Sequence, residues 1–225
     1  MPLPRIIAID GPAASGKSTL AEKLAQDLDY MYFDTGVMYR AVTLAALKEL
    51  NSVDDEIAVT SLAERVKIDV QHPAVKDGRK YTVDLDGMDV TWKLHEPCID
   101  GNVSKVSAYP GVRTAMTAQQ RMIGNRGNVV MVGRDIGTVV FPDAELKIYL
   151  DASAEERAIR RSQEIEARGE KANYLEILES IKRRDKIDSS RVVAPLRPAE
   201  DAVILNSDGK TIEDVLIEAK RLLDL

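Results

Sequence analysis

The stretch from Gly11 to Thr19, "GPAASGKST", constrains the fold of this chain most, because it fits G-x-x-x-x-G-K-[ST], the phosphate-binding loop. It follows "RIIAI" (5–9), a β-branched run typical of a buried parallel strand. Leucines then recur every four residues, which predicts a helix over 17–28. The sequence therefore places the loop at a strand-to-helix turn, where backbone N–H groups and a helix N-terminus favour phosphate.

The chemistry of this loop assigns roles to its residues. Glycines lack a Cβ, so the backbone can close around phosphate oxygens. Lys17 is expected to reach the β- and γ-phosphates of ATP, and the Ser18 hydroxyl is expected to bind Mg²⁺. The predicted ATP phosphate-binding residues are Gly11, Pro12, Ala13, Ala14, Ser15, Gly16, Lys17, Ser18 and Thr19.

The composition of the chain limits which binding partners and which cellular compartment are expected. The formal net charge of −6 over 225 residues argues against a broad nucleic-acid footprint. The start "MPLPR" lacks the apolar segment of a signal peptide, and no apolar run approaches the length of a membrane span. A single cysteine, Cys98, excludes an internal disulfide and fits a reducing compartment. We expect a cytoplasmic monomer with no nucleic-acid or membrane partner.

Strand and helix patterns alternate along the chain, which predicts an α/β fold with a parallel sheet covered by helices on both faces. Two charged helices are expected after the strand at 146–150, up to about Ser190. The other expected elements are strands at 5–9, 31–33, 128–132, 146–150 and 202–205 and helices at 17–28, 36–50, 54–65 and 212–223.

The stretch from Val66 to Leu94 departs from this alternation. "VKIDV" and "YTVDLDGMDVTW" alternate apolar and polar residues around the turn signal Asp86-Gly87, which predicts three short antiparallel strands. Asp84, Asp86 and Asp89 do not form a calcium loop, because Gly87 stands two residues too early for the EF-hand spacing. The segment is predicted to be a small β insert.

The strand at 128–132 distinguishes among proteins with a phosphate loop. The chain lacks the N-K-x-D motif of a GTPase, and this strand does not end in the apolar-apolar-Asp form of many ATPases. It continues into Gly133, Arg134 and Asp135, at the strand end where open α/β sheets bind ligands. An arginine and a carboxylate there favour a small kinase with a phosphorylated second substrate.

Six motifs in family order give the chain a close resemblance to bacterial cytidylate kinases, nucleoside monophosphate kinases that phosphorylate CMP and dCMP with ATP and Mg²⁺. They are "GPAASGKST", "DTGVMYR", "VSKVSAYPGVR", "VGRDIGTVVFPDA", "ERAIRR" and "RRDKIDSSRVVAPLRPAEDA". The resemblance spans the whole chain and implies one domain. Its expected parts are a core (1–35, 110–151 and 192–225), a monophosphate-binding lobe (about 36–109, with the β insert at about 66–94) and a lid (about 152–174).

The same resemblance implies the role of individual residues. Thr35, Arg113 and Asp135 match positions that read cytosine, for which a carboxylate acceptor and a guanidinium donor are suited. The other implied CMP-binding residues are Ser104, Arg184 and Asp188 for the ribose and Arg40, Arg134 and Arg191 for the phosphate. The implied catalytic residues are Lys17, Arg157 and Arg161.

The arginines of two predicted helices could bind a ligand or form salt bridges on a solvated face. Arg184, Asp188 and Arg191 follow the i, i+4, i+7 spacing of one helix face, which is also typical of a solvated salt-bridge stripe. The arginines 157, 160 and 161 are expected to project together from one side of another helix. His72 and His95 lack metal-ligand spacing, and no role is predicted for them.

Two alternatives to a CMP/dCMP kinase remain at this point. One is a kinase for another monophosphate, UMP or AMP. The other is a nucleotide sensor that binds without turnover, which intact Lys17 and Ser18 argue against.

Overall fold

The computed structural model describes residues 2–224. Its main sheet is parallel, in the strand order β2-β6-β1-β7-β8, so that β1 pairs with β6 on one side and with β7 on the other. The strands are largely buried, as expected for a parallel sheet covered on both faces, except the edge strand β8, in which only Leu205 is buried. Their bounds are β1 (Ile6–Asp10), β2 (Met31–Asp34), β6 (Val129–Gly133), β7 (Leu146–Asp151) and β8 (Val203–Asn206).

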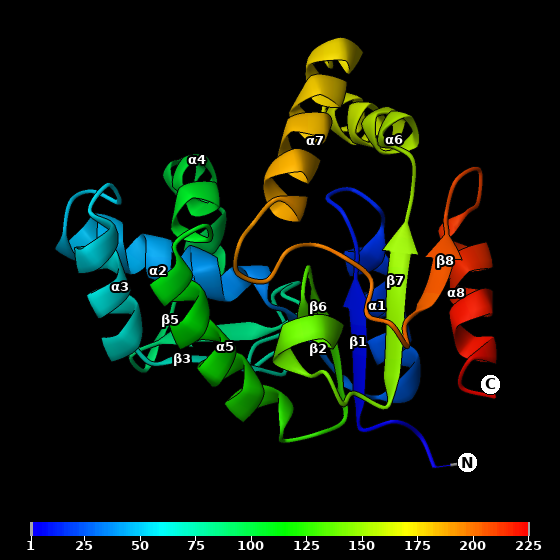
Figure 1. Ribbon diagram of the computed structural model, residues 1–225, viewed down its shortest axis with the longest axis horizontal. Coiled ribbons are helices and arrows are strands. Elements are labelled where there is room, and N and C mark those ends of the chain that lie inside the picture. The colour runs from blue at the N-terminus through cyan, green and yellow to red at the C-terminus, as the bar shows by residue number, and fades with distance from the viewer. Residues whose placement is uncertain (1, 225) are drawn as a thin grey trace.

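Helices cover both faces of this sheet, which confirms the predicted α/β fold (Figure 1). In this view α1 lies behind the strands, with α8 packed against it, while η2 and α5 lie in front. The pair α6 and α7 stands above the carboxyl ends of the strands. The bounds are α1 (Lys17–Leu28), α2 (Gly36–Glu49), α3 (Glu56–Arg65), α4 (Pro97–Val106), α5 (Pro110–Gly124), the π-helix η2 (Ile136–Val140), α6 (Ala154–Ala167), α7 (Tyr174–Ser189) and α8 (Ile212–Arg221).

Within residues 2–224, no helix combines the length and the apolar character that crossing a membrane requires.

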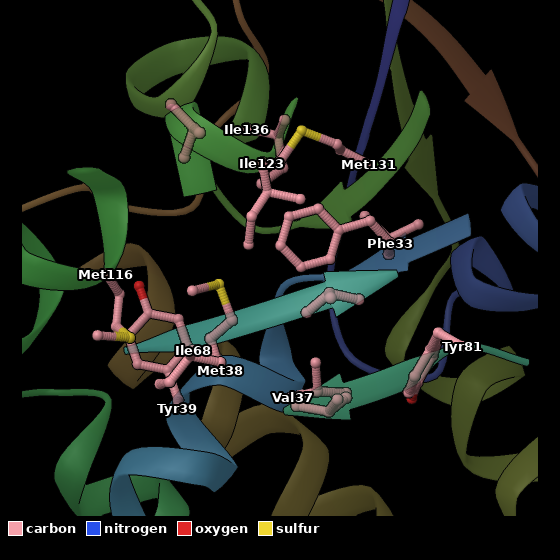
Figure 2. Close-up of a cluster of buried hydrophobic side chains, with 14 of the residues drawn as sticks. Phe33, Val37, Met38, Tyr39, Ile68, Tyr81, Met116, Ile123, Met131 and Ile136 are labelled. Carbon is pink, nitrogen blue, oxygen red and sulfur yellow. The ribbon is translucent and has the colours of Figure 1, made fainter. Parts of the chain in front are cut away.

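The β insert is confirmed as a separate antiparallel sheet of β3 (Ile68–Gln71), β4 (Thr82–Leu85) and β5 (Met88–Asp89). Asp86 and Gly87 join β4 to β5 with positive φ angles of 51° and 80°, as a two-residue hairpin requires. Figure 2 shows Ile68 and Tyr81 from the insert in one buried cluster with Phe33 of β2. Burial of these side chains anchors the insert on the core.

Most predicted element boundaries agree with the structure to within two residues, and the differences have local causes. The helix expected from residue 54 begins at Glu56, because the Asp55 side chain caps it by accepting a hydrogen bond from the Ala58 N–H at 3.0 Å. The alternating pattern that continues to Trp92 predicts a longer last strand than the structure has, since β5 ends at Asp89. The Asp89 carboxylate accepts from Thr91 N and Oγ1, and the chain turns there into a 3₁₀ helix, η1 (Thr91–His95).

Candidate active site

The phosphate loop connects β1 to α1, as the sequence predicts. A Cβ added to Gly11 would lie 2.2 Å from the Leu150 carbonyl oxygen, so only glycine lets the loop pass this close to β7. Gly16 caps α1 with a φ of 89°, a left-handed conformation that side chains disfavour. The two glycines of the motif therefore shape the loop for separate steric reasons.

Lys17 is the first residue of α1, and its side chain folds back over the loop. Its ammonium donates to the Pro12 carbonyl oxygen at 2.9 Å, and the residue is buried. Burial, and then the neighbouring Arg134 guanidinium, hold the pKa of Lys17 well below its usual value. Ser18, next along the helix, donates from its hydroxyl to the Asp34 carboxylate at 3.4 Å.

A cavity of about 330 Å³ opens on one side of this loop. Every residue that the sequence comparison implies for CMP lines it, together with Lys17 and Ser18 of the loop. The implied residues are Thr35, Arg40, Ser104, Arg113, Arg134, Asp135, Arg184, Asp188 and Arg191. They come from β2, α2, α4, α5, the β6 end and the α7 end, so the fold gathers segments far apart in the chain.

Arg113 and Asp135 form a buried ion pair at this cavity. The Arg113 Nη2 donates to the Asp135 carboxylate at 2.7 Å, and the guanidinium carbon lies 5.5 Å from the Tyr39 ring centroid. The Thr35 hydroxyl donates to the Val132 carbonyl oxygen at 2.8 Å. Because its hydrogen is already used, the Thr35 oxygen faces a ligand as an acceptor only.

A cluster of cations surrounds Asp188 near the end of α7. One carboxylate oxygen of Asp188 accepts from Arg134 Nε at 2.9 Å, and the other pairs with Arg191. Arg184 has no ion pair among the described residues, and burial, followed by the Arg134 charge, lowers its pKa. With one buried carboxylate among these guanidinium groups, the cluster has excess positive charge and favours an anion.

Arg191 departs from the predicted helix face. The helix α7 ends at Ser189, so Arg191 lies in the segment beyond it and not on the same face as Arg184. It nevertheless reaches the Asp188 carboxylate and lines the cavity. The three residues of the i, i+4, i+7 pattern therefore line one cavity, but they do not share one helix face.

Arg40 is held in place by two contacts. Its Nη1 donates to the Leu94 carbonyl oxygen at 2.9 Å and to Asp100 of α4 at 2.5 Å. His95 of η1 lines the same cavity, where burial and then the Arg40 charge lower its pKa. Tyr39 and Tyr81 also line it. Sequence reasoning missed these three residues, and only the position of Tyr39 within "DTGVMYR" could have indicated one of them.

The arginines of α6 point in different directions, which contradicts the expectation that they project together. Arg157 is buried and donates to both Asp185 oxygens at 3.1 and 2.6 Å and to the Ala13 carbonyl oxygen of the phosphate loop. Arg160 donates to the Ser207 hydroxyl at 3.0 Å. Arg161 pairs with Glu164 on the exposed side of the helix. The structure brings Arg157, but not Arg161, to the phosphate loop.

A second cavity, of about 540 Å³, lies on the other side of the phosphate loop. It shares Ala14, Lys17 and Ser18 with the first cavity. Its remaining walls come mainly from the loop, the first turn of α1, α6, the segment after β8 and the start of α8. They include Gly16, Thr19, Arg160, Gln163, Ser207, Thr211 and Val215. The loop therefore forms a wall common to the two cavities.

Asp10, the last residue of β1, is a buried carboxylate beneath the phosphate loop. It accepts hydrogen bonds from the N–H groups of Ile136 and Gly137 at 2.9 and 2.8 Å. Burial outweighs these contacts and raises the pKa of Asp10 from 3.8 to about 6.

This raised pKa predicts a dependence of stability on pH. The folded-state pKa lies above the unfolded one, so the stabilising contribution is complete below pH 3.8 and is lost as the pH rises through about 6. Relative to an Asp10→Asn variant, the parent should lose about 1.4 kcal/mol of unfolding free energy between about pH 5 and about pH 7.5. Urea unfolding of both proteins at the two pH values measures this, and a constant difference would contradict it.

Comparison with known proteins agrees with this arrangement. A family model described as Cytidylate kinase matches residues 7–224. The chain is 51% identical over 217 residues to the cytidylate kinase of Roseiflexus castenholzii and 49% identical over 215 residues to that of Herpetosiphon aurantiacus. Both alignments cover 96% of this chain and 92% of the relative.

A solved structure of an uncharacterized protein from Eubacterium ventriosum resembles this one over 97% of this chain and 98% of that chain, with a TM-score of 0.50 at 12% identity. At that identity the likeness concerns the fold alone. The family model and the relatives extend over nearly the whole sequence, from β1 through the cation cluster to α8. By this measure the chain belongs to the cytidylate kinase family.

Proposed function

We propose that this protein transfers the γ-phosphoryl group of ATP to CMP and dCMP, giving CDP and dCDP. The observation that carries the proposal is the first cavity, in which all the side chains that we propose for the base, the ribose and the phosphate of CMP converge beside Lys17. Membership in the cytidylate kinase family supports the same reaction.

Hydrogen-bond complementarity favours cytosine at the Asp135 end of the cavity. The cytosine amine has two hydrogens to donate, and the Asp135 carboxylate and the Thr35 oxygen are both acceptors. Arg113 has a buried Nε without a partner among the described residues, so it retains a donor for the base. Uracil carries an oxygen in place of the amine and offers no hydrogen to either acceptor, which discriminates strongly.

The cation cluster suits the phosphate of the acceptor. Arg40, Arg134 and Arg191 offer guanidinium groups to its oxygens. When a phosphate takes these groups, the Asp188 oxygens that now bind Arg134 and Arg191 become available to the sugar hydroxyls. Ser104 and Arg184 complete the proposed ribose contacts.

We place the ATP phosphates on the loop from Gly11 to Thr19 and the rest of ATP in the second cavity. The hydroxyl of Ser18 and the carboxylate of Asp34, 3.4 Å apart, fit Mg²⁺, which takes a few protein oxygens together with water and phosphates. Bound Mg²⁺ supplies neutralisation of phosphate charge.

Phosphoryl transfer then needs positioning and charge stabilisation more than covalent chemistry. An ionised oxygen of the CMP phosphate attacks the γ-phosphorus in line, the bond from that phosphorus to the β–γ bridging oxygen breaks, and ADP leaves. Lys17 and Arg157, both at the phosphate loop, spread the negative charge of the transition state. For Arg161 to share this role, the lid segment at about 152–174 must move, because the side chain now faces Glu164.

We further infer a single-domain monomer, divided into the core, lobe and lid given above, that acts on small molecules in the cytoplasm and not on nucleic acid. The net charge of −6 and the single cysteine support this inference.

A substrate panel tests the proposed reaction. Steady-state turnover with ATP is measured for CMP, dCMP, UMP and AMP, with ADP release as the readout. CMP and dCMP should have the largest kcat/KM values. Preferred use of UMP or AMP would establish the other kinase assignment, and binding without ADP release would establish a sensor.

The base-reading role predicts the effect of Asp135→Asn. The CMP:UMP ratio of kcat/KM should fall about 10-fold, equal to about 1.4 kcal/mol of differential transition-state binding. An asparagine amide can donate to the uracil oxygen, whereas a carboxylate can only accept. Poorer use of CMP should account for most of the change, since Thr35 and Arg113 still suit cytosine.

Asp143→Asn is the matched control, because it removes an exposed carboxylate from a turn outside both cavities. It should leave the ratio unchanged. If Asp135→Asn lowers both rates and preserves the ratio, Asp135 orients Arg113 and does not read the base.

A further inference from the structure

The loops that follow β1 and β6 meet at one edge of the sheet. Asp10 ends β1 and stands opposite Gly133, which ends β6, in the strand register. The phosphate loop begins directly after Asp10, and Arg134 and Asp135 follow Gly133. Whatever fixes these two loops to each other therefore also fixes the donor site relative to the acceptor site.

The side chain of Asp10 makes this connection. Its two oxygens accept from Ile136 N at 2.9 Å and from Gly137 N at 2.8 Å. Arg134 Nη1 returns a third hydrogen bond, to the Gly11 carbonyl oxygen at 3.0 Å. Asp10 is 5% exposed and is not among the described residues that line either cavity. It contacts the two loops and not a ligand site.

The Lys147 side chain packs closely against the backbone of Gly137, which supplies one of the two N–H groups. A Cβ on Gly137 would lie 3.1 Å from Lys147 Cδ and 3.5 Å from the Asp10 carboxylate. The close approach is to the Lys147 stem, and the distance to Asp10 is that of an ordinary van der Waals contact. Ile136, which supplies the other N–H group, is 1% exposed. Arg134 and Asp135 directly precede Ile136, so the hydrogen bond from Ile136 N to Asp10 also restricts where their backbone can lie.

We propose that Asp10 is a positioning residue, which holds the backbone that carries Arg134 and Asp135 against the phosphate loop and thereby sets CMP affinity and cytosine specificity without touching either nucleotide. The inference rests on the acceptor site proposed above. It assigns a role in the reaction to a side chain buried beneath both cavities.

The state of this carboxylate supports a role beyond packing. Burial raises the pKa of Asp10 to about 6, so at neutral pH the folded protein keeps an ionised group in an environment that disfavours it. Asp135 adds repulsion, and Lys17 together with the two backbone N–H groups offsets part of the effect. Buried groups with such shifts concentrate at functional sites.

Asp10→Asn tests the proposal. Asparagine keeps the shape but offers one acceptor oxygen, so its amide NH₂ must face a backbone N–H group. We expect KM for CMP to rise about 10-fold and the CMP:UMP ratio of kcat/KM to fall about 5-fold. KM for ATP should stay within about 3-fold of the parent value, because the phosphate loop keeps its own glycines and Lys17.

A double variant separates positioning from general destabilisation. If Asp10 acts through the loop that carries Asp135, adding Asp10→Asn to Asp135→Asn should lower the CMP:UMP ratio little further. Leu62→Ala is the control, since it truncates a buried side chain of α3 outside both cavities. It should lower the unfolding midpoint and leave the ratio unchanged.

Several outcomes would overturn the proposal. A folded Asp10→Asn protein with parental KM for CMP and a parental ratio would do so, as would losses that add fully in the double variant. If Asp10→Asn fails to fold, Asp10→Ser takes its place, because serine has only one side-chain oxygen and cannot accept from both N–H groups as the carboxylate does. A parental ratio and KM in that variant would also overturn the proposal. If Asp135→Asn alone leaves the ratio unchanged, the proposed base contact fails, and KM for CMP, which reports Arg134, still decides the role of Asp10.

Discussion

Replacing Lys17 with alanine should lower kcat by about 100-fold or more while the protein stays folded, because the change removes a charge partner of the transition state. Its ammonium lies against the phosphate loop, with Pro12 as its hydrogen-bond acceptor and both cavities beside it. Burial already lowers the pKa of Lys17, so loss of this cation relieves a desolvation cost in the fold. Steady-state kinetics and urea unfolding together measure the two effects.

Lys17→Met is the matched variant, since methionine fills a similar volume without the charge. It should lose as much turnover as Lys17→Ala and should be at least as stable as the parent. Turnover within a few-fold of the parent in both variants would remove Lys17 from the reaction. A large loss confined to the alanine variant would indicate that volume, and not charge, matters at this position.

Asp188→Ala should cost about 3 kcal/mol of unfolding free energy, the lower end of the range for removing one partner of a buried ion pair. Asp188 is almost fully buried, and its carboxylate is shared by Arg134 and Arg191, which retain partial exposure. Without it, these two arginines and Arg184 repel one another in a partly dry site. Urea unfolding at neutral pH measures the loss, and kinetics should show a higher KM for both CMP and dCMP, which share the 3′-hydroxyl.

An anion should partly rescue this variant. Sulfate can occupy the space between the guanidinium groups and needs no sugar contact, so it should raise the unfolding midpoint of Asp188→Ala more than that of the parent. Asp185→Ala provides a comparison, because Asp185 pairs with Arg157 outside this cluster. A loss below about 1 kcal/mol together with an unchanged KM for both nucleotides would contradict both proposed roles of Asp188, in the ion-pair cluster and at the sugar.

Local patterns in the sequence were sufficient to predict the phosphate loop and the β insert. Gly11 and Gly16 stand at the two positions where the loop disfavours a side chain, so the motif itself reports the steric requirement. Asp86 and Gly87 form the turn of the β4–β5 hairpin, and this residue pair alone indicates such a turn. Every residue implied for CMP lines one cavity, although the evidence for their roles came from the resemblance and not from spacing.

Long-range contacts account for what could not be predicted. The π-helix η2 begins where Asp10 accepts from Ile136 and Gly137, and Asp10 lies more than a hundred residues earlier in the chain. Helical spacing places Arg157 and Arg161 on neighbouring positions of α6. Only the tertiary partner Asp185 draws the first inward, whereas Glu164 holds the second at the surface. Periodicity along one helix contains no information about such partners.

The wall shared by the two cavities has a consequence for inhibitor design. Because Ala14, Lys17 and Ser18 belong to both, a ligand in one cavity ends where a ligand in the other begins. A single molecule that joins cytidine to adenosine through a chain of phosphates could then occupy both. Its second half would bind at an effective concentration in the millimolar range, so the joined molecule should exceed either half in affinity by a factor on the order of 100 or more.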